Sequence, residues 1–136
     1  MKRQVLVLCT GNSARSQMAE GLLRHLGQGE IEVFSAGTAP SAVHPMAVRV
    51  MEEIEIDISS HRSKDLDGFR HSSFDDVITV CDNAAESCPV FPGGARRTHW
   101  SLPDPVAVQG DEGERLAAFR RVREALDSRM RRWLQR

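Results

Sequence analysis

Short apolar runs alternate with amphipathic stretches along this chain, and this alternation limits the possible folds more than any other feature of the sequence. Residues 5–8 (VLVL) form the first continuous apolar run, which is typical of a strand buried on both faces. The expected strands are residues 5–8, 31–34, 77–80 and 98–100. Strands that alternate with helices predict a parallel sheet. We therefore expect an α/β fold in a single domain, residues 1–136, with a four-stranded parallel sheet flanked by helices on both faces.

Helical stripes separate these strands. Apolar residues recur at a spacing of about four before Gly27, which is expected to end the first helix. Pro45 is tolerated in the first turn of a helix, so a second helix is expected to begin there. A short helix is expected near residues 65–69. The clearest stripe closes the domain and consists of Leu116, Phe119, Val122, Leu126, Met130 and Trp133.

The bulk properties exclude several classes of protein. The formal net charge is −1, so we expect neither a nucleic-acid partner nor a membrane partner. The arginine-rich stretch 115–136 contains acidic residues and is interpreted as the solvated face of a helix, with nucleic-acid binding as the alternative. No apolar run reaches the ~20 residues that cross a bilayer, and residues 5–8 are too short for a signal-peptide core. We expect a cytoplasmic protein and a monomer.

The chain contains three cysteines, Cys9, Cys81 and Cys88. An odd number fits poorly with a framework of structural disulfides, and thiols in the cytoplasm are kept reduced. The three residues are therefore expected to be reactive or simply buried. Their spacings do not resemble a zinc motif, so no metal site with His71 or His99 is expected, and no cofactor is expected either.

The segment between the first strand and the first helix has the composition of an oxyanion-binding loop. Successive backbone N–H groups in such a turn can form a concave nest, to which the helix N-terminus adds partial positive charge. Gly11 is expected to permit unusual backbone angles, and Asn12 to tie the loop by side-chain hydrogen bonds. The expected oxyanion-binding residues are Thr10, Gly11, Asn12, Ser13, Ala14, Arg15 and Ser16.

Cys9 is expected to lie at the base of this loop, where the same dipoles favour its thiolate. Arg15 supplies a planar fork of donors suited to a tetrahedral oxyanion. An oxyanion held over a thiolate is a nucleophilic site. The alternative is that Cys9 is a buried cysteine at a strand end and Arg15 a surface residue of the helix.

The string from Val7 to Gly21 resembles the phosphate-binding loop and first helix of the thioredoxin-coupled arsenate reductases, which share the fold of the low-molecular-weight tyrosine phosphatases. Further similar segments follow in the same order, so the resemblance covers essentially the whole chain. They are Ser35-Ala36-Gly37, Asp57-Ile58-Ser59, His99-Trp100, Asp104-Pro105 and Arg120-Arg121-Val122-Arg123.

The resemblance implies a relay of three thiols. Reduction of arsenate to arsenite takes two electrons, which two thiols supply when they become a disulfide. Cys9 would attack arsenic with Asp104 as the general acid, and Cys81 would then attack Cys9 and release arsenite. Cys88 would move the disulfide to Cys81–Cys88, which thioredoxin would reduce. Glutaredoxin or a small thiol remains an alternative reductant.

Spacing makes this relay mechanically demanding. If residues 81–88 are helical, seven residues at 1.5 Å each separate the two ends by roughly 10 Å. A disulfide requires Cα atoms about 4.4–6.8 Å apart. The segment must therefore unwind or loop out during turnover.

Two alternative functions remain open. One is a phosphomonoester phosphatase of the same fold, although Gln17 stands where such phosphatases usually have proline. Val106 and Ala107 likewise stand where phosphatases usually carry tyrosines, and this chain has no tyrosine. The other alternative is a non-enzymatic redox or oxyanion sensor. For Asp104, a simple Asp-Pro turn is the local alternative.

Some members of the family bind potassium near the loop through an asparagine, a glutamate, a serine and an aspartate. Asn12, Glu20 and Ser35 match the first three, and Lys64 stands in place of the aspartate, unless a one-residue shift restores Asp65. A lysine ammonium would replace or exclude the cation. We therefore expect potassium to have little effect on activity.

Overall fold

Four parallel strands form one sheet in the order β2-β1-β3-β4. The computed structural model describes residues 2–135, without the side chain of Ser87, so the expected domain limits 1 and 136 lie just outside the described residues. The strands are β1 (Arg3–Cys9), β2 (Ile31–Gly37), β3 (Asp76–Thr79) and β4 (Arg96–His99). The predicted four-stranded parallel α/β fold is confirmed.

Two of the strand limits that differ from the expected ones lie at buried polar residues. β2 continues through Ser35, and β3 begins at Asp76, and both residues are fully buried. Ser35 donates a hydrogen bond to Glu20, and Asp76 pairs with Arg3. Because these partners come from distant parts of the chain, a search for apolar runs stops short of the real strand ends.

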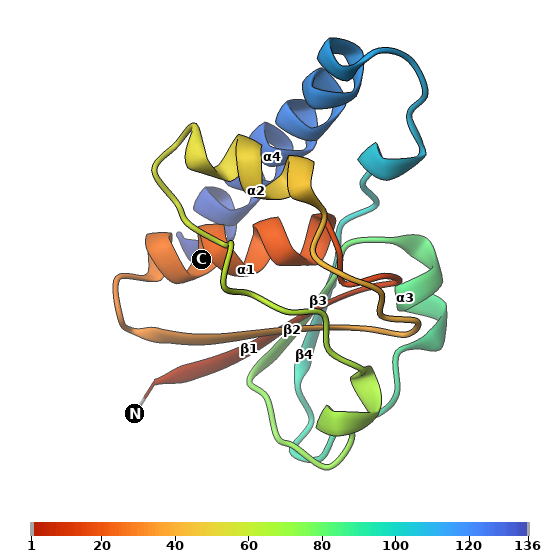
Figure 1. Cartoon of the computed structure of the whole chain (residues 1–136). Helices are drawn as coiled ribbons and strands as arrows, with labels where there is room; N and C mark the ends of the chain where they lie inside the picture. Colours follow the sequence, from red (N-terminus) through yellow and green to blue (C-terminus); the bar gives the residue numbers. More distant parts are fainter. Residues whose placement is uncertain (1, 136) are drawn as a thin grey trace.

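Three helices cover one face of the sheet, and shorter segments cover the other (Figure 1). The first face carries α1 (Arg15–Gly27), α2 (Pro45–Glu52) and α4 (Glu112–Leu134), and α4 packs against both α1 and α2. On the opposite face lies the 3₁₀ helix η1 (Leu66–Phe69). Two further short helices, α3 (Asp82–Ser87) and η2 (Pro105–Ala107), follow β3 and β4. No helix within residues 2–135 has the length and apolar character needed to span a membrane.

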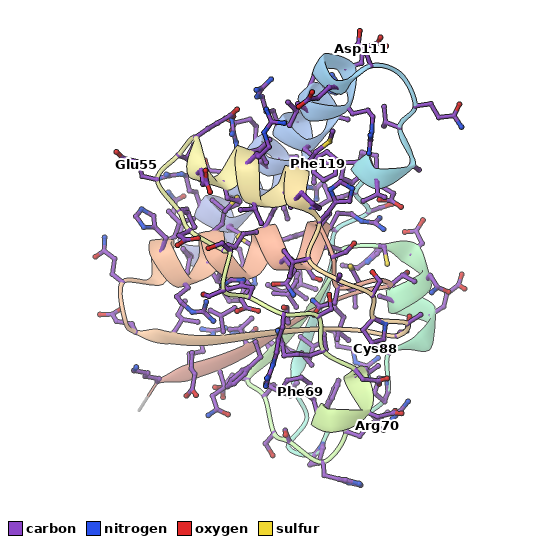
Figure 2. All side chains as sticks on the ribbon, in the orientation of Figure 1. Glu55, Phe69, Arg70, Cys88, Asp111 and Phe119 are labelled. Carbon is purple, nitrogen blue, oxygen red and sulfur yellow. The ribbon has the colours of Figure 1, made fainter. Side chains whose placement is uncertain are left out.

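The sheet separates two apolar layers. Residues 5–8 of β1 are fully buried, as their continuous apolar run predicts. On the helical side, Phe119 of α4 is fully buried and contacts the ring of His44. On the other side, Phe34 of β2 contacts Phe69 and Phe74. Figure 2 shows Phe119 and Phe69 on opposite sides of the sheet.

The carboxyl ends of β1, β2 and β3 meet at one edge because the strands are parallel and in register. Cys9 is the last residue of β1 and pairs with Gly37, the last residue of β2. A Cβ atom at Gly37 would lie 2.5 Å from the carbonyl oxygen of Thr10 and 3.0 Å from the backbone nitrogen of Asn12. The loop after Cys9 therefore packs directly on a position that only glycine can occupy.

Replacing Gly37 with alanine should push this loop away from β2. We expect Gly37→Ala to lower the free energy of unfolding by about 1–3 kcal/mol, because the added methyl group overpacks a rigid backbone contact. It should also weaken phosphate binding, measured by calorimetry. The matched control is Gly68→Ala, since a Cβ at Gly68 meets no atom within 4 Å. Equal effects of the two substitutions on both measurements would contradict this account.

Candidate active site

The loop of residues 10–14 turns its carbonyl groups outward. Backbone N–H groups in the following segment, residues 38–44, donate to them. The acceptors are the carbonyls of Cys9, Thr10, Gly11 and Ser13, at distances of 2.9–3.3 Å. No described residue accepts a hydrogen bond from the backbone N–H groups of residues 11–14. Because the loop carbonyls are hydrogen-bonded to residues 38–44, these N–H groups remain available to bind an anion on the other side of the loop.

The N-terminus of α1 adds to this donor set. Ala14 is its N-cap residue and makes no side-chain capping hydrogen bond. The N–H groups of a first helical turn lack partners within the helix, and the helix dipole concentrates positive charge there. The end of α1 and the loop together offer N–H donors of the kind that the predicted oxyanion-binding loop needs.

Asn12, not Gly11, adopts the unusual backbone conformation of the loop. Its φ angle is 47°, in the left-handed region, whereas Gly11 has no positive φ. The expectation for Gly11 was therefore wrong, and the expectation that Asn12 ties the loop is confirmed. The Asn12 amide donates to Ser16 Oγ (2.7 Å) and accepts from the backbone N–H of Lys64 (2.8 Å) and from Gln17 Nε2 (3.0 Å). A short polar side chain can adopt this conformation when its amide is held so firmly.

Cys9 is buried at the base of the loop, with 2% of its surface exposed. Ser16 Oγ donates a hydrogen bond to Cys9 Sγ over 3.2 Å. Because the Ser16 hydroxyl also accepts from Asn12, its proton is directed to the sulfur.

Arg15 is not a surface residue, since only 11% of its side chain is exposed. Its Nη1 donates to the carbonyl of Leu102 over 3.0 Å, and its Nη2 lies 3.8 Å from Asp104 Oδ2. Asp104 caps η2 by accepting from the N–H of Val106. Asp104 therefore fits both interpretations, because it forms the Asp-Pro turn and also places a carboxylate next to Arg15.

Cys81 lies beside the loop that follows Cys9. It comes two residues after β3 and forms the N-cap of α3, where its sulfur accepts from the N–H of Ala84 (3.4 Å). Its sulfur also lies 3.3 Å from Thr10 Oγ1. Because Thr10 directly follows Cys9, the structure brings the ends of β1 and β3 together as the topology predicts.

Cys88 is at the other end of the same short helix. Residues 82–87 are helical, with Cys81 as the N-cap and Cys88 as the C-cap. Cys88 is half-buried, and burial raises the pKa of its thiol, an effect that nearby Arg97 partly opposes. Figure 2 shows Cys88 at the end of α3. The helix thus covers residues 82–87 of the segment 81–88, with one cysteine at each of its ends.

A cluster of charges supports the loop from below. Buried Glu20 accepts from Ser35 Oγ at Oε1 (2.5 Å) and from Arg24 Nη2 at Oε2 (2.7 Å), and Lys64 Nζ lies 3.6 Å from Oε1. Burial acts to raise the pKa of Glu20, but these donors outweigh it and the pKa is lowered. Asp65 instead caps η1, accepting from Asp67 N. The lysine ammonium thus lies beside Glu20 and Ser35, two of the residues that match the potassium site of some family members.

The structural role of Gln17 is not evident from the sequence. Its side chain is fully buried, and Nε2 donates to Asn12 and to the carbonyl of Arg62 (2.9 Å). Its Oε1 lies 3.0 Å from His61 Nδ1. Gln17 thus ties the loop to the segment before η1. No local pattern marks this role, since a glutamine in the first helical turn is usually solvated.

No group of three or more potential metal ligands from His, Cys, Asp and Glu is found among residues 2–135. The cysteines Cys9, Cys81 and Cys88 are free thiols. The chemistry that the site offers is therefore an anion cradle with one thiol at its base and two more nearby.

Comparison with known proteins agrees with this arrangement. A family model described as low molecular weight phosphotyrosine protein phosphatase matches residues 4–136, and the chain belongs to this family. An arsenate reductase of Halalkalibacterium halodurans is 44% identical over 131 residues, which are 96% of this chain and 94% of the relative. Within the family fold, the chain is thus placed with the arsenate reductases.

Solved structures give the same result. An arsenate reductase in the phosphate binding state is 36% identical, with a TM-score of 0.78 and coverage of 98% of this chain and 97% of that chain. A thioredoxin-dependent arsenate reductase of Corynebacterium glutamicum is 30% identical, with a TM-score of 0.75, and the match covers 98% of this chain and 61% of that one. The tyrosine phosphatase Wzb of Escherichia coli K30 is 24% identical, with a TM-score of 0.82 and coverage of 99% of this chain and 98% of that chain. At this identity, the likeness shows only that the two proteins share a fold.

Potassium should have little effect on this protein, because the Lys64 ammonium already lies beside Glu20 and Ser35. We expect the melting temperature and the steady-state activity to be equal in potassium and sodium chloride at the same ionic strength. Lys64→Met should lower the melting temperature in both salts, since it removes a cation from a buried carboxylate. A large increase in the melting temperature or activity of the wild-type protein in potassium chloride, but not in sodium chloride, would contradict this prediction.

Proposed function

We propose that this protein reduces arsenate to arsenite through Cys9, Cys81 and Cys88, and that thioredoxin regenerates it. The observation that carries the proposal is the placement of Cys81 beside the oxyanion loop of Cys9, with Cys88 one short helix away. The relatives named arsenate reductase support the substrate, and the thioredoxin-dependent relative supports the reductant. The free thiols suit the reducing cytoplasm.

Arsenate would bind in the cradle, with Arg15 and the N–H groups of residues 11–14 donating to its oxygens. The thiolate of Cys9, stabilised by Ser16, attacks arsenic and forms a sulfur–arsenic bond. One oxygen of arsenate leaves as water. Asp104, next to Arg15, is suited to donate the proton that this leaving group needs.

The second step transfers the electrons. The thiolate of Cys81 attacks the sulfur of Cys9, and a Cys9–Cys81 disulfide forms as the sulfur–arsenic bond breaks. The bonding pair stays on arsenic, which leaves as arsenite. The N–H of Ala84, in the first turn of α3, donates a hydrogen bond to the sulfur of Cys81.

The third step frees Cys9 for another cycle. Cys88 attacks Cys81, the disulfide moves to Cys81–Cys88, and Cys9 leaves as a thiolate. In the reduced protein, burial keeps Cys88 protonated and α3 keeps it at a distance. Unwinding of α3 removes both obstacles, and exposes the new disulfide to thioredoxin.

The phosphatase alternative has less support. The oxyanion cradle would serve either reaction, so slow hydrolysis of an aryl phosphate is compatible with both. Val106 is partly exposed after Asp104-Pro105 and supplies no aromatic ring to stack on a substrate. The thiol pair 81 and 88 would be superfluous in a hydrolase.

Turnover with Cys88→Ser tests the relay. Given arsenate, thioredoxin, thioredoxin reductase and NADPH, the wild-type protein should oxidise NADPH steadily, because the disulfide reaches the surface. Cys88→Ser should release about one arsenite per protein and then stop. Cys9→Ser should release none, which controls for background reduction. Unimpaired steady turnover of Cys88→Ser would exclude the relay, and efficient aryl phosphate hydrolysis independent of Cys88 would favour the phosphatase.

Unwinding of α3 is a separate prediction. We expect hydrogen exchange of residues 82–92 to accelerate when the protein is oxidised by one equivalent of arsenate, because the Cα atoms of Cys81 and Cys88 must approach. Residues 116–130 of α4 serve as an internal reference, since they take no part in the exchange. Unchanged protection across residues 82–92 in a protein proven to contain the 81–88 disulfide would contradict the prediction.

A further inference from the structure

Both ends of the segment that unwinds in the proposed relay are held by one strand. At the first end, His99 Nε2 lies 2.9 Å from Oδ1 of Asp82, the first residue of α3. At the other end, Arg97 Nη2 donates a hydrogen bond to the carbonyl of Pro89, the residue after Cys88. Both His99 and Arg97 belong to β4. β4 therefore contacts the segment next to each of its two cysteines.

The spacing of these two contacts suits the third step of the relay. Residues 97 and 99 are two apart on one strand, so their side chains point to the same face and their Cα atoms lie roughly 6.6 Å apart. A disulfide between Cys81 and Cys88 needs Cα atoms about 4.4–6.8 Å apart, whereas a helix over this segment separates its ends by roughly 10 Å. Two contacts at the spacing of β4 can therefore hold the ends of the segment near each other while its middle unwinds.

The carbonyl of Pro89 also binds the thiol of Cys88. Cys88 Sγ lies 3.6 Å from this oxygen and donates to it, so the thiol and the Arg97 guanidinium share one acceptor. Burial raises the pKa of the Cys88 thiol, and the positive charge of Arg97 opposes this rise. Cys88 must lose its proton before it attacks, and a cation close to the sulfur favours the thiolate that remains.

Arg97 has no competing charged partner. The preceding residue, Arg96, lies 3.4 Å from the buried carboxylate of Asp76. Arg97 is exposed and forms no ion pair within residues 2–135. Glu86, the acidic residue of α3 closest in sequence to Cys88, is also exposed and does not pair with Arg97. The guanidinium therefore binds the Pro89 carbonyl and remains available to the sulfur beside it.

We infer that Arg97 is a positioning residue for the third step, in which Cys88 attacks Cys81. It keeps the Pro89 end of the segment on β4 while α3 unwinds, and it holds a positive charge beside the attacking sulfur. In that step a bond between sulfurs 88 and 81 forms as the bond between sulfurs 81 and 9 breaks. The bonding pair stays on Cys9, and the proton of Cys88 goes to solvent. This inference rests on the proposed function.

The alternative is that Arg97 only protects an open edge of the sheet. β4 is the last strand in the order β2-β1-β3-β4, and charged side chains on such an edge discourage pairing with another chain. In that case, replacement of Arg97 would change neither the chemistry of Cys88 nor the rate of the third step. The two cases differ in what happens after arsenite has been released.

A single turnover separates the third step from the first two. Reduced protein is mixed with one equivalent of arsenate in the absence of thioredoxin and stopped with acid, and the released arsenite and the two disulfides are then measured. We expect Arg97→Ala to release arsenite at the wild-type rate. Transfer of the disulfide to Cys88 should be about three- to tenfold slower, the effect of one lost hydrogen bond, and Arg97→Lys should restore most of the rate.

The matched control is Arg131→Ala, which removes an exposed arginine of α4 and should leave both rates unchanged. Disulfide transfer at the wild-type rate in Arg97→Ala would overturn the inference. Equal slowing of arsenite release and disulfide transfer would also overturn it, because Arg97 would then act on the fold or on the anion cradle.

The pH profile of Cys88 tests the charge of Arg97 without arsenate. In a Cys9→Ser, Cys81→Ser background, the rate of reaction of Cys88 with iodoacetamide is followed against pH. We expect the midpoint to move to higher pH in Arg97→Ala and in Arg97→Gln, because removal of a cation raises the pKa of a neighbouring thiol. Arg97→Lys should return the midpoint towards that of the protein with Arg97. The midpoint, unlike the plateau rate, does not depend on how accessible the sulfur is.

A midpoint that is the same in all four proteins would overturn the inference, even if Arg97→Ala melts at a lower temperature, since Arg97 would then be only structural. The melting temperature should stay close to that of the wild-type protein because Arg97 is exposed. Arsenate turnover by the wild-type protein tests the proposed function, whereas the pH profile of Cys88 involves no arsenate. Failure of the one is therefore distinguishable from failure of the other.

Discussion

The active site depends on the way in which the side chain of Asn12 is held. Its amide bonds to Ser16, Gln17 and the backbone of Lys64, and its own backbone is left-handed. This conformation lets the loop carbonyls face outward while the N–H groups face inward. Through Ser16, the same amide directs a proton to the sulfur of Cys9. In the proposed mechanism, the binding of the anion and the attack by Cys9 therefore depend on one set of hydrogen bonds.

In the proposed relay, helix α3 has two opposing effects. Its N-terminus donates to the sulfur of Cys81, the attacking group, while its length separates Cys88 from Cys81. A six-residue helix is short enough to open at small cost, because it has few internal hydrogen bonds. The order of the thiol steps then follows from the helix: it is intact for the first exchange and open for the second.

The charge cluster beneath the loop gives the site a rigid support. Glu20 is buried with Arg24, Lys64 and Ser35, so the desolvation of its carboxylate is offset by several donors. Gln17 and His61 connect this cluster to the loop. A buried charge with so many partners favours one arrangement of the surrounding backbone over others. The loop is thus supported by polar contacts below and by Gly37 behind.

The sequence by itself determined the parallel α/β architecture, the oxyanion loop and the three thiols, because apolar periodicity and the composition of residues 9–16 are local signals. It also indicated that Cys9 and Cys81 each follow an apolar strand, and the pairing of β1 with β3 in the structure makes these two strand ends neighbours. Only the tertiary structure decided that Asn12 rather than Gly11 is left-handed, that Gln17 holds the loop, and that Arg97 reaches Pro89. These features arise from contacts between residues far apart in the chain or from side-chain directions that periodicity does not define. The buried polar ends of β2 and β3 escaped the sequence for the same reason, because the partners of Ser35 and Asp76 become neighbours only on folding.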